Sequence, residues 1–385
     1  MYPKKTFVFN QLQMKPSIVK QVYTIQFADS LLFLRGFLQD INYIKFNSKM
    51  KLQTSIHRVI YVFCVMLVLT SCQKSGPTIG FMLPHMGNRR YVVEKAAFTK
   101  RVEELGGKVI FMSADNDEEK QITQAKEILK QGIDVLVLDP VNRFRAAEMI
   151  RLAQDKDVKV ISYDRLVANC NVDALITFDP AAIGNQMTSY ALSRRPEGKY
   201  IILGGDKSDI NAVLVGKAVE KSLEPAIKSG KIRILYESYL DKYSEDDAKN
   251  ELAACLKLSM EKPDAIITSG DFLANGAIDV LSTYGWNDEV LVTGQNGELV
   301  ALKNILKNKQ AMTVYKPVKK MATTTAEIAV DLSKGKKVKN FFKSSIFNGS
   351  VDVPSTFLDV ITVDATNIKS TVIADGFYTD EEVFK

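Results

Sequence analysis

Short apolar runs alternate with longer amphipathic segments along the chain from residue 78 onward. Apolar runs of four to eight residues rich in β-branched side chains are typical of buried strands, and the longer periodic segments are typical of helices. In the first half we expect strands at 78–83, 108–112, 134–138, 158–163 and 174–178, with helices at 90–105, 118–131 and 145–155. This order predicts a parallel sheet covered by helices.

The alternation then begins again. We expect strands at 200–203, 233–236, 265–268, 290–293 and 312–315, and helices at 210–228, 246–260, 273–284, 298–306 and 319–333. The predicted fold class is therefore α/β, with two similar, doubly wound parallel-sheet lobes that face each other across a cleft.

The run 158–163 ends abruptly at Asp164 and Arg165. In an open α/β sheet, ligands bind just outside the carboxyl ends of the strands, so this pair lies where a small polar molecule would be held. An ordinary ion pair at the end of a strand explains the same two residues, and the octapeptide alone does not separate these interpretations.

The N-terminal region has the composition of an export signal. His57 and Arg58 precede an apolar run over 59–69, which is too short to favour a membrane-spanning helix. The run is followed by Leu69-Thr70-Ser71-Cys72, which resembles a bacterial lipobox in which the cysteine is acylated. We therefore expect a lipoprotein signal peptide at 50–71, lipidation at Cys72 and a linker at 72–77. The alternative is a buried core helix.

The same region predicts the natural start of the protein. Met50 and Lys51 stand before the charged and apolar parts of the signal, as the first residues of a signal peptide do. Residues 1–49 contain scattered apolar patches without sustained periodicity. We expect Met50 to be the initiator and 1–49 to be a non-native upstream extension.

Composition excludes several classes of function. The 51 basic and 45 acidic residues are interspersed and give a net charge of +6, so no nucleic-acid partner is indicated. Only two histidines are present, and the four cysteines form no CxxC pair, so we expect no metal site. Cys170 and Cys255 remain as a conceivable disulfide, although a lone buried thiol is the commoner case.

Motifs of catalysis and of cofactor binding are also missing. Gly216-Lys217 is followed by Ala218, so the phosphate-binding GxxxxGK[ST] loop is absent, as are GxSxG, HExxH and GxGxxG. Asp206 and Asp209 form a carboxylate pair that a glycosidase could use, but such spacing in loops usually marks solvated turns. We predict that the protein is not an enzyme and has no cofactor.

Several segments together resemble the type I periplasmic sugar-binding proteins, and most closely the xylose-binding group of ABC transporters. The resemblance runs from Thr78 to Phe384, and it rests on the order and spacing of the segments rather than on any one of them. They are 134–138, 163–165, 177–179, 229–232, 313–317, 326–330 and 352–355.

The resemblance implies two lobes joined by three crossovers, which we expect near 178–180, 294–295 and 315–317. It assigns 78–178 and 296–315 to the N-terminal lobe, and 179–295 and 316–385 to the C-terminal lobe.

The resemblance also implies the residues that contact the sugar. Matching or equivalent positions are Arg90, Tyr91, Asp164, Arg165, Asn211, Tyr243, Gly270, Asp271, Asn296 and Lys316. Charged and amide groups satisfy sugar hydroxyls, and aromatic faces cover the C–H surface of the ring. Each of these residues also has a structural alternative, such as a surface ion pair or a core position.

Some of these positions depart from the family pattern. Gly270 replaces an Asn, Asn296 replaces an Asp beside Gln295, and Tyr91 and Tyr243 replace Trp. The departures preserve a sugar-like ligand but put xylose itself in doubt.

The implied function is a lipid-anchored receptor on the periplasmic side of the cell envelope, which binds a monosaccharide and delivers it to an ABC permease. One alternative is a sensory module that passes its closed state to a signalling partner. Another is a sugar-responsive transcription factor, which would need an N-terminal helix-turn-helix where this chain carries the export signal.

Overall fold

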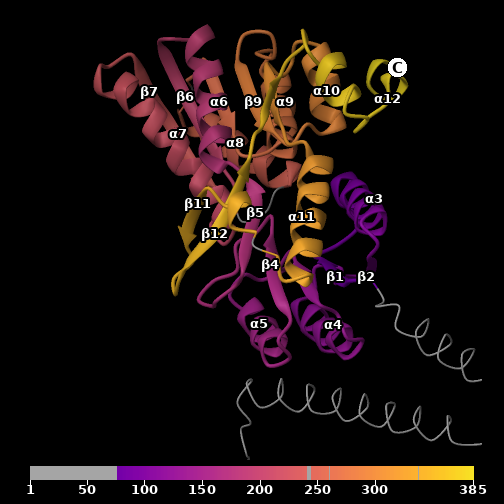
Figure 1. The fold of residues 1–385 in the computed structure, drawn as a ribbon. Helices are drawn as coiled ribbons and strands as arrows, with labels where there is room; N and C mark the ends of the chain where they lie inside the picture. The colour runs from indigo at the N-terminus through magenta and orange to yellow at the C-terminus, as the bar shows by residue number, and fades with distance from the viewer. Residues whose placement is uncertain (1–75, 241–243, 260, 337) are drawn as a thin grey trace, which may run out of the picture. The chain divides into compact units, whose positions relative to one another are not determined.

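The computed structural model describes residues 76–240, 244–259, 261–336 and 338–385, with no account of the Lys339 side chain. The predicted signal peptide, the lipidation site Cys72 and the extension 1–49 lie outside these residues, as does Tyr243. Ser75–Lys385 forms one compact unit, in which two sheets lie as separate groups of strands (Figure 1).

The first sheet has seven strands in the order β11-β12-β5-β4-β3-β1-β2. All neighbours are parallel except β11 and β12. The strands are β1 (Thr78–Leu83), β2 (Lys108–Ser113), β3 (Val135–Leu138), β4 (Lys159–Tyr163), β5 (Ala174–Phe178), β11 (Ser344–Phe347) and β12 (Asp352–Leu358).

Helices cover both faces of the first sheet. On one face α3 (Arg89–Glu104) packs against α11 (Val318–Ser333), and on the other α4 (Glu118–Lys130) packs against α5 (Ala146–Gln154). Phe81 of β1 stacks on Phe98 of α3 with ring centroids 4.2 Å apart. Burial of such apolar faces on both sides explains why the strands read as continuous hydrophobic runs.

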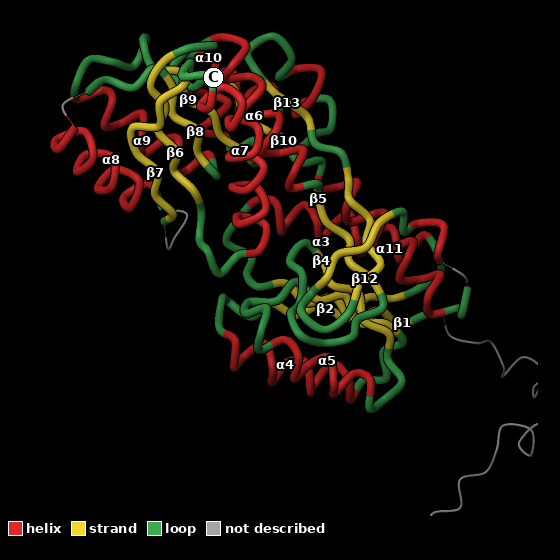
Figure 2. The backbone as a smooth tube through the Cα atoms, turned by 90° about the vertical axis from the view of Figure 1, so that its left-hand side faces the viewer, coloured by secondary structure: helices red, strands yellow, loops and turns green. Residues whose placement is uncertain are grey.

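The second sheet has six strands in the order β13-β10-β9-β8-β6-β7, all parallel except for the β10–β13 pair. The strands are β6 (Gly198–Gly204), β7 (Ile232–Tyr239), β8 (Ala265–Thr268), β9 (Leu291–Gln295), β10 (Met312–Tyr315) and β13 (Ile361–Val363). The helices are α6 (Pro180–Arg194), α7 (Ile210–Lys228), α8 (Glu245–Ser259), α9 (Asp271–Thr283), α10 (Leu299–Leu306) and α12 (Asp380–Phe384). Figure 2 shows the helices on both sides of the strands.

The predicted α/β class with two doubly wound lobes is confirmed, but the assignment of the late segments to lobes is wrong. Residues 312–315, expected in the N-terminal lobe, pair with β9 in the second sheet. Within 316–385, expected in the C-terminal lobe, α11 packs on α3 and β12 pairs with β5 in the first sheet.

The three crossovers follow from these pairings. The chain leaves the first lobe between β5 and α6, returns between β10 and α11, and leaves again between β12 and β13. The expected crossovers near 178–180 and 315–317 agree with these positions. The one expected near 294–295 is wrong, because Gln295 continues β9 inside the second sheet, and the third crossover lies at 359–360.

Helix α6 was not expected from the sequence, although Ile183, Met187 and Ala191 form a buried apolar row along it. A Cβ added at Gly184 would lie 2.6 Å from the backbone oxygen of Val215, so α6 packs very closely on α7. Asp179 begins the helix as its N-cap and accepts hydrogen bonds from the backbone of Ala181 and Ala182.

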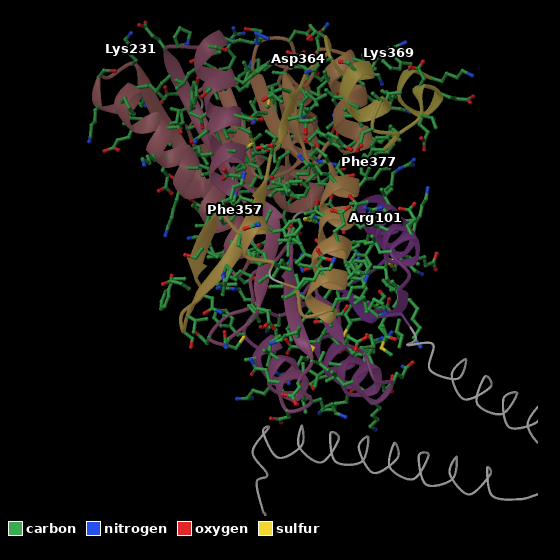
Figure 3. All side chains as sticks on the ribbon, viewed as in Figure 1. Arg101, Lys231, Phe357, Asp364, Lys369 and Phe377 are labelled. Carbon is green, nitrogen blue, oxygen red and sulfur yellow. The ribbon has the colours of Figure 1, made fainter. Side chains whose placement is uncertain are left out.

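The side chains fill the space between the sheets and their helices (Figure 3). Cys170 and Cys255 are both buried and both free, in separate apolar clusters, so they form no disulfide with each other. Among the described residues, no helix is both long and apolar enough to cross a membrane.

Candidate functional site

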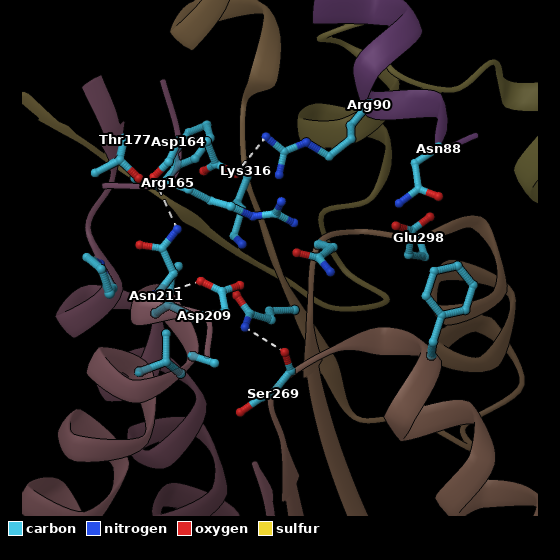
Figure 4. Close-up of a pocket in the computed structure, with 18 of the residues that line it drawn as sticks. Asn88, Arg90, Asp164, Arg165, Thr177, Asp209, Asn211, Ser269, Glu298 and Lys316 are labelled. Carbon is cyan, nitrogen blue, oxygen red and sulfur yellow. Dashed lines mark hydrogen bonds and ion pairs between the residues drawn. The ribbon is translucent and has the colours of Figure 1, made fainter. Parts of the chain in front are cut away.

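A cavity of about 300 Å³ lies between the carboxyl ends of the strands of the two sheets. Residues that follow β1, β4 and β5 line it from the first lobe, and residues that follow β6, β8 and β9 line it from the second. Figure 4 shows polar side chains from both lobes pointing into this space. This is where an open α/β sheet binds small molecules.

The cavity brings together seven of the ten residues that the sequence predicted to contact a ligand. They are Arg90, Tyr91, Asp164, Arg165, Asn211, Asn296 and Lys316. Tyr243 lies outside the described residues, and Gly270 and Asp271 are not among the lining residues.

Three of the lining residues, Asn116 with φ of 62° among them, have a left-handed backbone although none is glycine. Asp164 has φ of 59° and Asn296 has φ of 108°. The turn at Asp164 directs the chain out of β4, and its backbone nitrogen still donates to Ile176 in β5. Asp and Asn tolerate such conformations better than other residues, and backbones of this kind cluster at binding sites.

Arg90 connects the cavity to the interior of the first lobe. Its Nη2 lies 3.1 Å from Oδ2 of Asp164 and 2.8 Å from Oε1 of Glu94, which is fully buried one turn further along α3. Burial raises the pKa of Glu94 to about 7, against the opposing charge of Arg90. The guanidinium is therefore shared between two carboxylates, which fixes its orientation.

Asp164 stays ionised despite its burial. Burial acts to raise the pKa of this carboxyl group, but the charges of Arg90, Lys316 and Arg165 outweigh that effect and hold the pKa below its ordinary value. An ionised carboxylate at the cavity wall is a strong acceptor for ligand hydroxyl groups.

Lys316 enters the cavity from the crossover between β10 and α11. Burial lowers the pKa of this amine, while the charge of Asp164 opposes the shift. Arg165 follows Asp164 in the turn after β4, and its Nη1 donates to the backbone oxygen of Pro140 at 3.2 Å. Arg165 is thus held at the cavity by its hydrogen bond to the main chain, and Lys316 by its position in a crossover.

The second lobe contributes the N-terminus of α7. Asp209 caps this helix by accepting a hydrogen bond from the backbone of Asn211 at 2.9 Å. The Nδ2 of Asn211 donates to the backbone oxygen of Asp164 at 3.2 Å, which joins the two lobes directly (Figure 4). Asn211 is therefore placed to respond to the separation of the lobes.

Tyr91 is buried more deeply than an aromatic residue that stacks on a sugar ring needs to be. It is only 2% exposed, and its ring meets that of His85 edge-on with centroids 4.7 Å apart. Phe272, at the start of α9, is a partly buried aromatic residue that also lines the cavity. It offers an aromatic surface from the second lobe that was not expected from the sequence.

The carboxylate of Asp271 is buried inside the second lobe, where it joins secondary-structure elements through hydrogen bonds. Its carboxylate accepts hydrogen bonds from Gln310 Nε2, from Thr313 Oγ1 and from the backbone nitrogen of Glu298, at 2.8–2.9 Å. Burial raises the pKa of Asp271 to about 7, against these hydrogen bonds. Gly270 precedes it as the N-cap of α9. These contacts connect α9 to β10 and α10 rather than to the cavity.

Several lining residues were missed because no recognisable motif marks them. The polar and aromatic ones are His85, Asn88, Asn116, Thr177, Phe178, Asp209, Ser269, Phe272, Gln295 and Glu298. Their only signal in the sequence is their position at or shortly after the end of a predicted strand, or at the start of a helix, where the ligand sites of open α/β sheets lie.

The charges that line the cavity balance. Among the described lining residues, the cations Arg90, Arg165 and Lys316 face three carboxylates, Asp164, Asp209 and Glu298. Such a mixture of donors and acceptors without net charge suits a neutral ligand rich in hydroxyl groups. In the described part of the chain, no group of His, Cys, Asp or Glu is arranged to hold a metal ion.

Comparisons with known proteins agree with this geometry. Residues 79–337 match the model of the periplasmic binding protein domain. The chain is 35% identical to the D-xylose-binding periplasmic protein of Haemophilus influenzae, over 82% of this chain and 94% of that protein. It is 34% identical to the D-xylose-binding periplasmic protein of Escherichia coli, over 85% of this chain and 99% of that protein.

A solved structure has the same fold. It is a carbohydrate transporter solute-binding protein from Chloroflexus aurantiacus in complex with D-glucose. The TM-score is 0.73 and the identity is 25%, and the alignment covers 79% of this chain and 97% of that one.

Proposed function

The chain belongs to the periplasmic sugar-binding proteins of type I fold, close to the xylose-binding group, and from this membership we propose that it captures a monosaccharide in the cavity between its lobes. Members of this family bind their ligands and are not enzymes. The observation that carries the proposal is the balanced set of charged and amide side chains that line the cavity from both lobes.

In this proposal, Asp164 and Arg165 bind sugar hydroxyl groups from the first lobe, Asn211 from the second, and Lys316 from a crossover. A ligand that contacts both lobes at once favours the closed arrangement, because only that arrangement completes its contacts. The closed form then delivers the sugar to an ABC transporter permease.

The ligand is xylose or a related sugar. The relatives named for D-xylose support a pentose, and the neighbour that holds D-glucose supports a hexose. Asn296 stands at the cavity where the xylose-binding pattern has Asp, so an acceptor is replaced by a group that also donates. Phe272 supplies the aromatic surface that the buried Tyr91 offers only in part.

A thermal-shift screen tests the proposal. Ser75–Lys385, the compact unit, is heated with D-xylose, D-ribose, D-glucose, D-galactose and their phosphates. A ligand that binds only the folded state raises the melting temperature by mass action. A rise with one free sugar supports the proposal and identifies the ligand, whereas no rise with any sugar contradicts it.

We also propose that Cys72 is acylated and anchors the protein to a membrane on its periplasmic side, because Leu69-Thr70-Ser71-Cys72 follows a short apolar run. Cells that express the chain from Met50 and are fed an alkyne fatty acid should label the protein. The variant Cys72→Ser should remain unlabelled, and equal labelling of both would contradict the anchor.

A further inference from the structure

Asp139 is a buried carboxylate that the proposed binding contacts do not use. It directly follows β3 and is 0% exposed. Neither of its carboxylate oxygens accepts a hydrogen bond from any described residue. An ionised carboxylate without donors is costly inside a protein, so this group needs either a proton or a close cation.

The nearest cation is Arg165, at the cavity wall. Its Nε lies 4.0 Å from Oδ1 of Asp139, which is an ion pair too long for a hydrogen bond. The Arg165 side chain is 30% exposed toward the cavity, and its Nη1 is held by the backbone oxygen of Pro140, the residue after Asp139. One edge of the Arg165 guanidinium is therefore held at the end of β3, and its other edge is accessible to a ligand in the cavity.

The other groups that act on Asp139 come from two elements. From α3 these are Arg90, Glu94 and Tyr91, and from the end of β4 they are Tyr163 and Asp164 besides Arg165. On the side of α4, Gln121 donates to the backbone oxygen of Asp139 and carries no charge. Burial raises the pKa of Asp139 well above its ordinary value, and Asp164 and Glu94 add to the rise while Arg165 and Arg90 oppose it.

We propose that Asp139 positions Arg165 for the ligand and releases a proton when a ligand fills the cavity. Water around the exposed edge of Arg165 screens its charge in the free protein. A sugar that displaces this water strengthens the attraction between Arg165 and Asp139, because the Coulomb energy rises as the effective dielectric constant falls. Asp139 is already fully buried, so it loses no further hydration.

The O–H bond of the Asp139 carboxyl group breaks, the proton passes to the buffer, and the complex carries one positive charge less than its separate components. Linkage then requires that affinity increases with pH in the range where the proton is released. This inference rests on the proposed function, because it needs a ligand in this cavity.

Titration calorimetry on Ser75–Lys385 tests the inference with D-xylose and with D-glucose as probes. Each titration is carried out at one pH in phosphate and in Tris, whose ionisation enthalpies differ, so the difference in heat counts the protons released. We expect release of up to one proton, and an affinity that increases with pH over the range in which the protein stays folded. Asp139→Asn should release almost none and bind about 10-fold more weakly, since Arg165 loses its partner.

Asp134→Asn is the matched control. Asp134 precedes β3 at the strand's other end, where its carboxylate accepts a hydrogen bond from the backbone of Thr78 at 2.7 Å. This variant should release as many protons as the unmodified protein. Circular dichroism and thermal melts verify that both variants fold.

Each outcome decides the inference. Sugar binding with equal heat in both buffers overturns it, and so does undiminished proton release by Asp139→Asn. If Asp139→Asn does not fold, the pH dependence of the unmodified protein decides, and an affinity that is constant across this pH range overturns the inference. Absence of binding by any sugar overturns the proposed function, and this inference with it.

Discussion

Asn211 of the second lobe donates a hydrogen bond to the backbone oxygen of Asp164 in the first lobe, 3.2 Å away. The bond crosses the cavity from the N-terminus of α7 to the turn that follows β4. It ties the separation of the lobes to Asp164, whose ionised carboxylate lies at the cavity wall.

Asn211→Ala should weaken sugar binding about 5-fold, because a hydrogen bond between the lobes contributes about 1 kcal/mol. Titration calorimetry measures the change. Asn185→Ala, on the exposed face of α6, is the control and should bind as the unmodified protein does. Equal affinity of Asn211→Ala and the control would contradict a role for this bond.

Arg165→Ala should lower affinity at least about 100-fold, because the charged donor at the end of β4 makes hydrogen bonds worth about 1.5–3 kcal/mol each. The melting temperature without ligand should change little, since Arg165 faces the cavity. Arg151→Ala, an exposed arginine on α5, should leave the affinity unchanged. Calorimetric curves for Arg165→Ala that match those of the unmodified protein would refute its role.

Asp271 should make the protein less stable as the pH rises from about 4 to about 7. Its pKa is about 7 in the folded state and 3.8 ordinarily, so the folded state binds the proton more tightly than the unfolded state. The stabilisation is complete below the unfolded value and is lost as the pH rises through the folded one. Urea unfolding across this range measures the slope.

Asp271→Asn should flatten that slope, and Asp279→Asn, an exposed residue of the same helix, should retain it. Glu94 contributes in the same direction, since its pKa is also about 7. A slope that is identical in Asp271→Asn and the unmodified protein would show that Asp271 does not cause it.

Arg89→Ala should loosen the C-terminal segment that carries Phe377 (Figure 3). The guanidinium of Arg89 holds Glu382 at 2.6 and 3.2 Å, donates to the backbone oxygen of Phe377 at 2.7 Å and covers the ring of Tyr378. Because the ion pair is about one-third exposed, we expect a loss of only about 1–2 kcal/mol and a melting temperature about 2–4 °C lower.

Glu381→Ala is the matched control for the C-terminal segment, because its carboxylate meets only the exposed Lys385 among the described residues. Its melting temperature should equal that of the unmodified protein. Limited proteolysis should cut the C-terminus faster in Arg89→Ala alone, and equal rates in both variants would contradict the fastening role of Arg89.

The sequence by itself determined the local structure and the position of much of the site. Apolar runs with β-branched residues specified strands such as β3 and β4, because burial on both faces leaves no polar alternation. Asp164 and Arg165 were identified because a predicted strand ends at them, and ligands of open α/β sheets bind at the carboxyl ends of the strands. Asn211 and Lys316 were identified only through the resemblance to the sugar-binding family.

Only the tertiary structure decided which lobe receives the late segments, since pairing between β12 and β5 joins residues 180 positions apart and leaves no local signal. The close packing of α6 on α7 at Gly184 was likewise decided only by the tertiary structure, because nothing local in the sequence shows which backbone approaches this glycine. The neighbours also distinguished two similar carboxylates: Asp271 has three hydrogen-bond donors inside a lobe, and Asp139, beside the cavity, has none among the described residues. Such differences depend on neighbours that the chain brings together only when it folds.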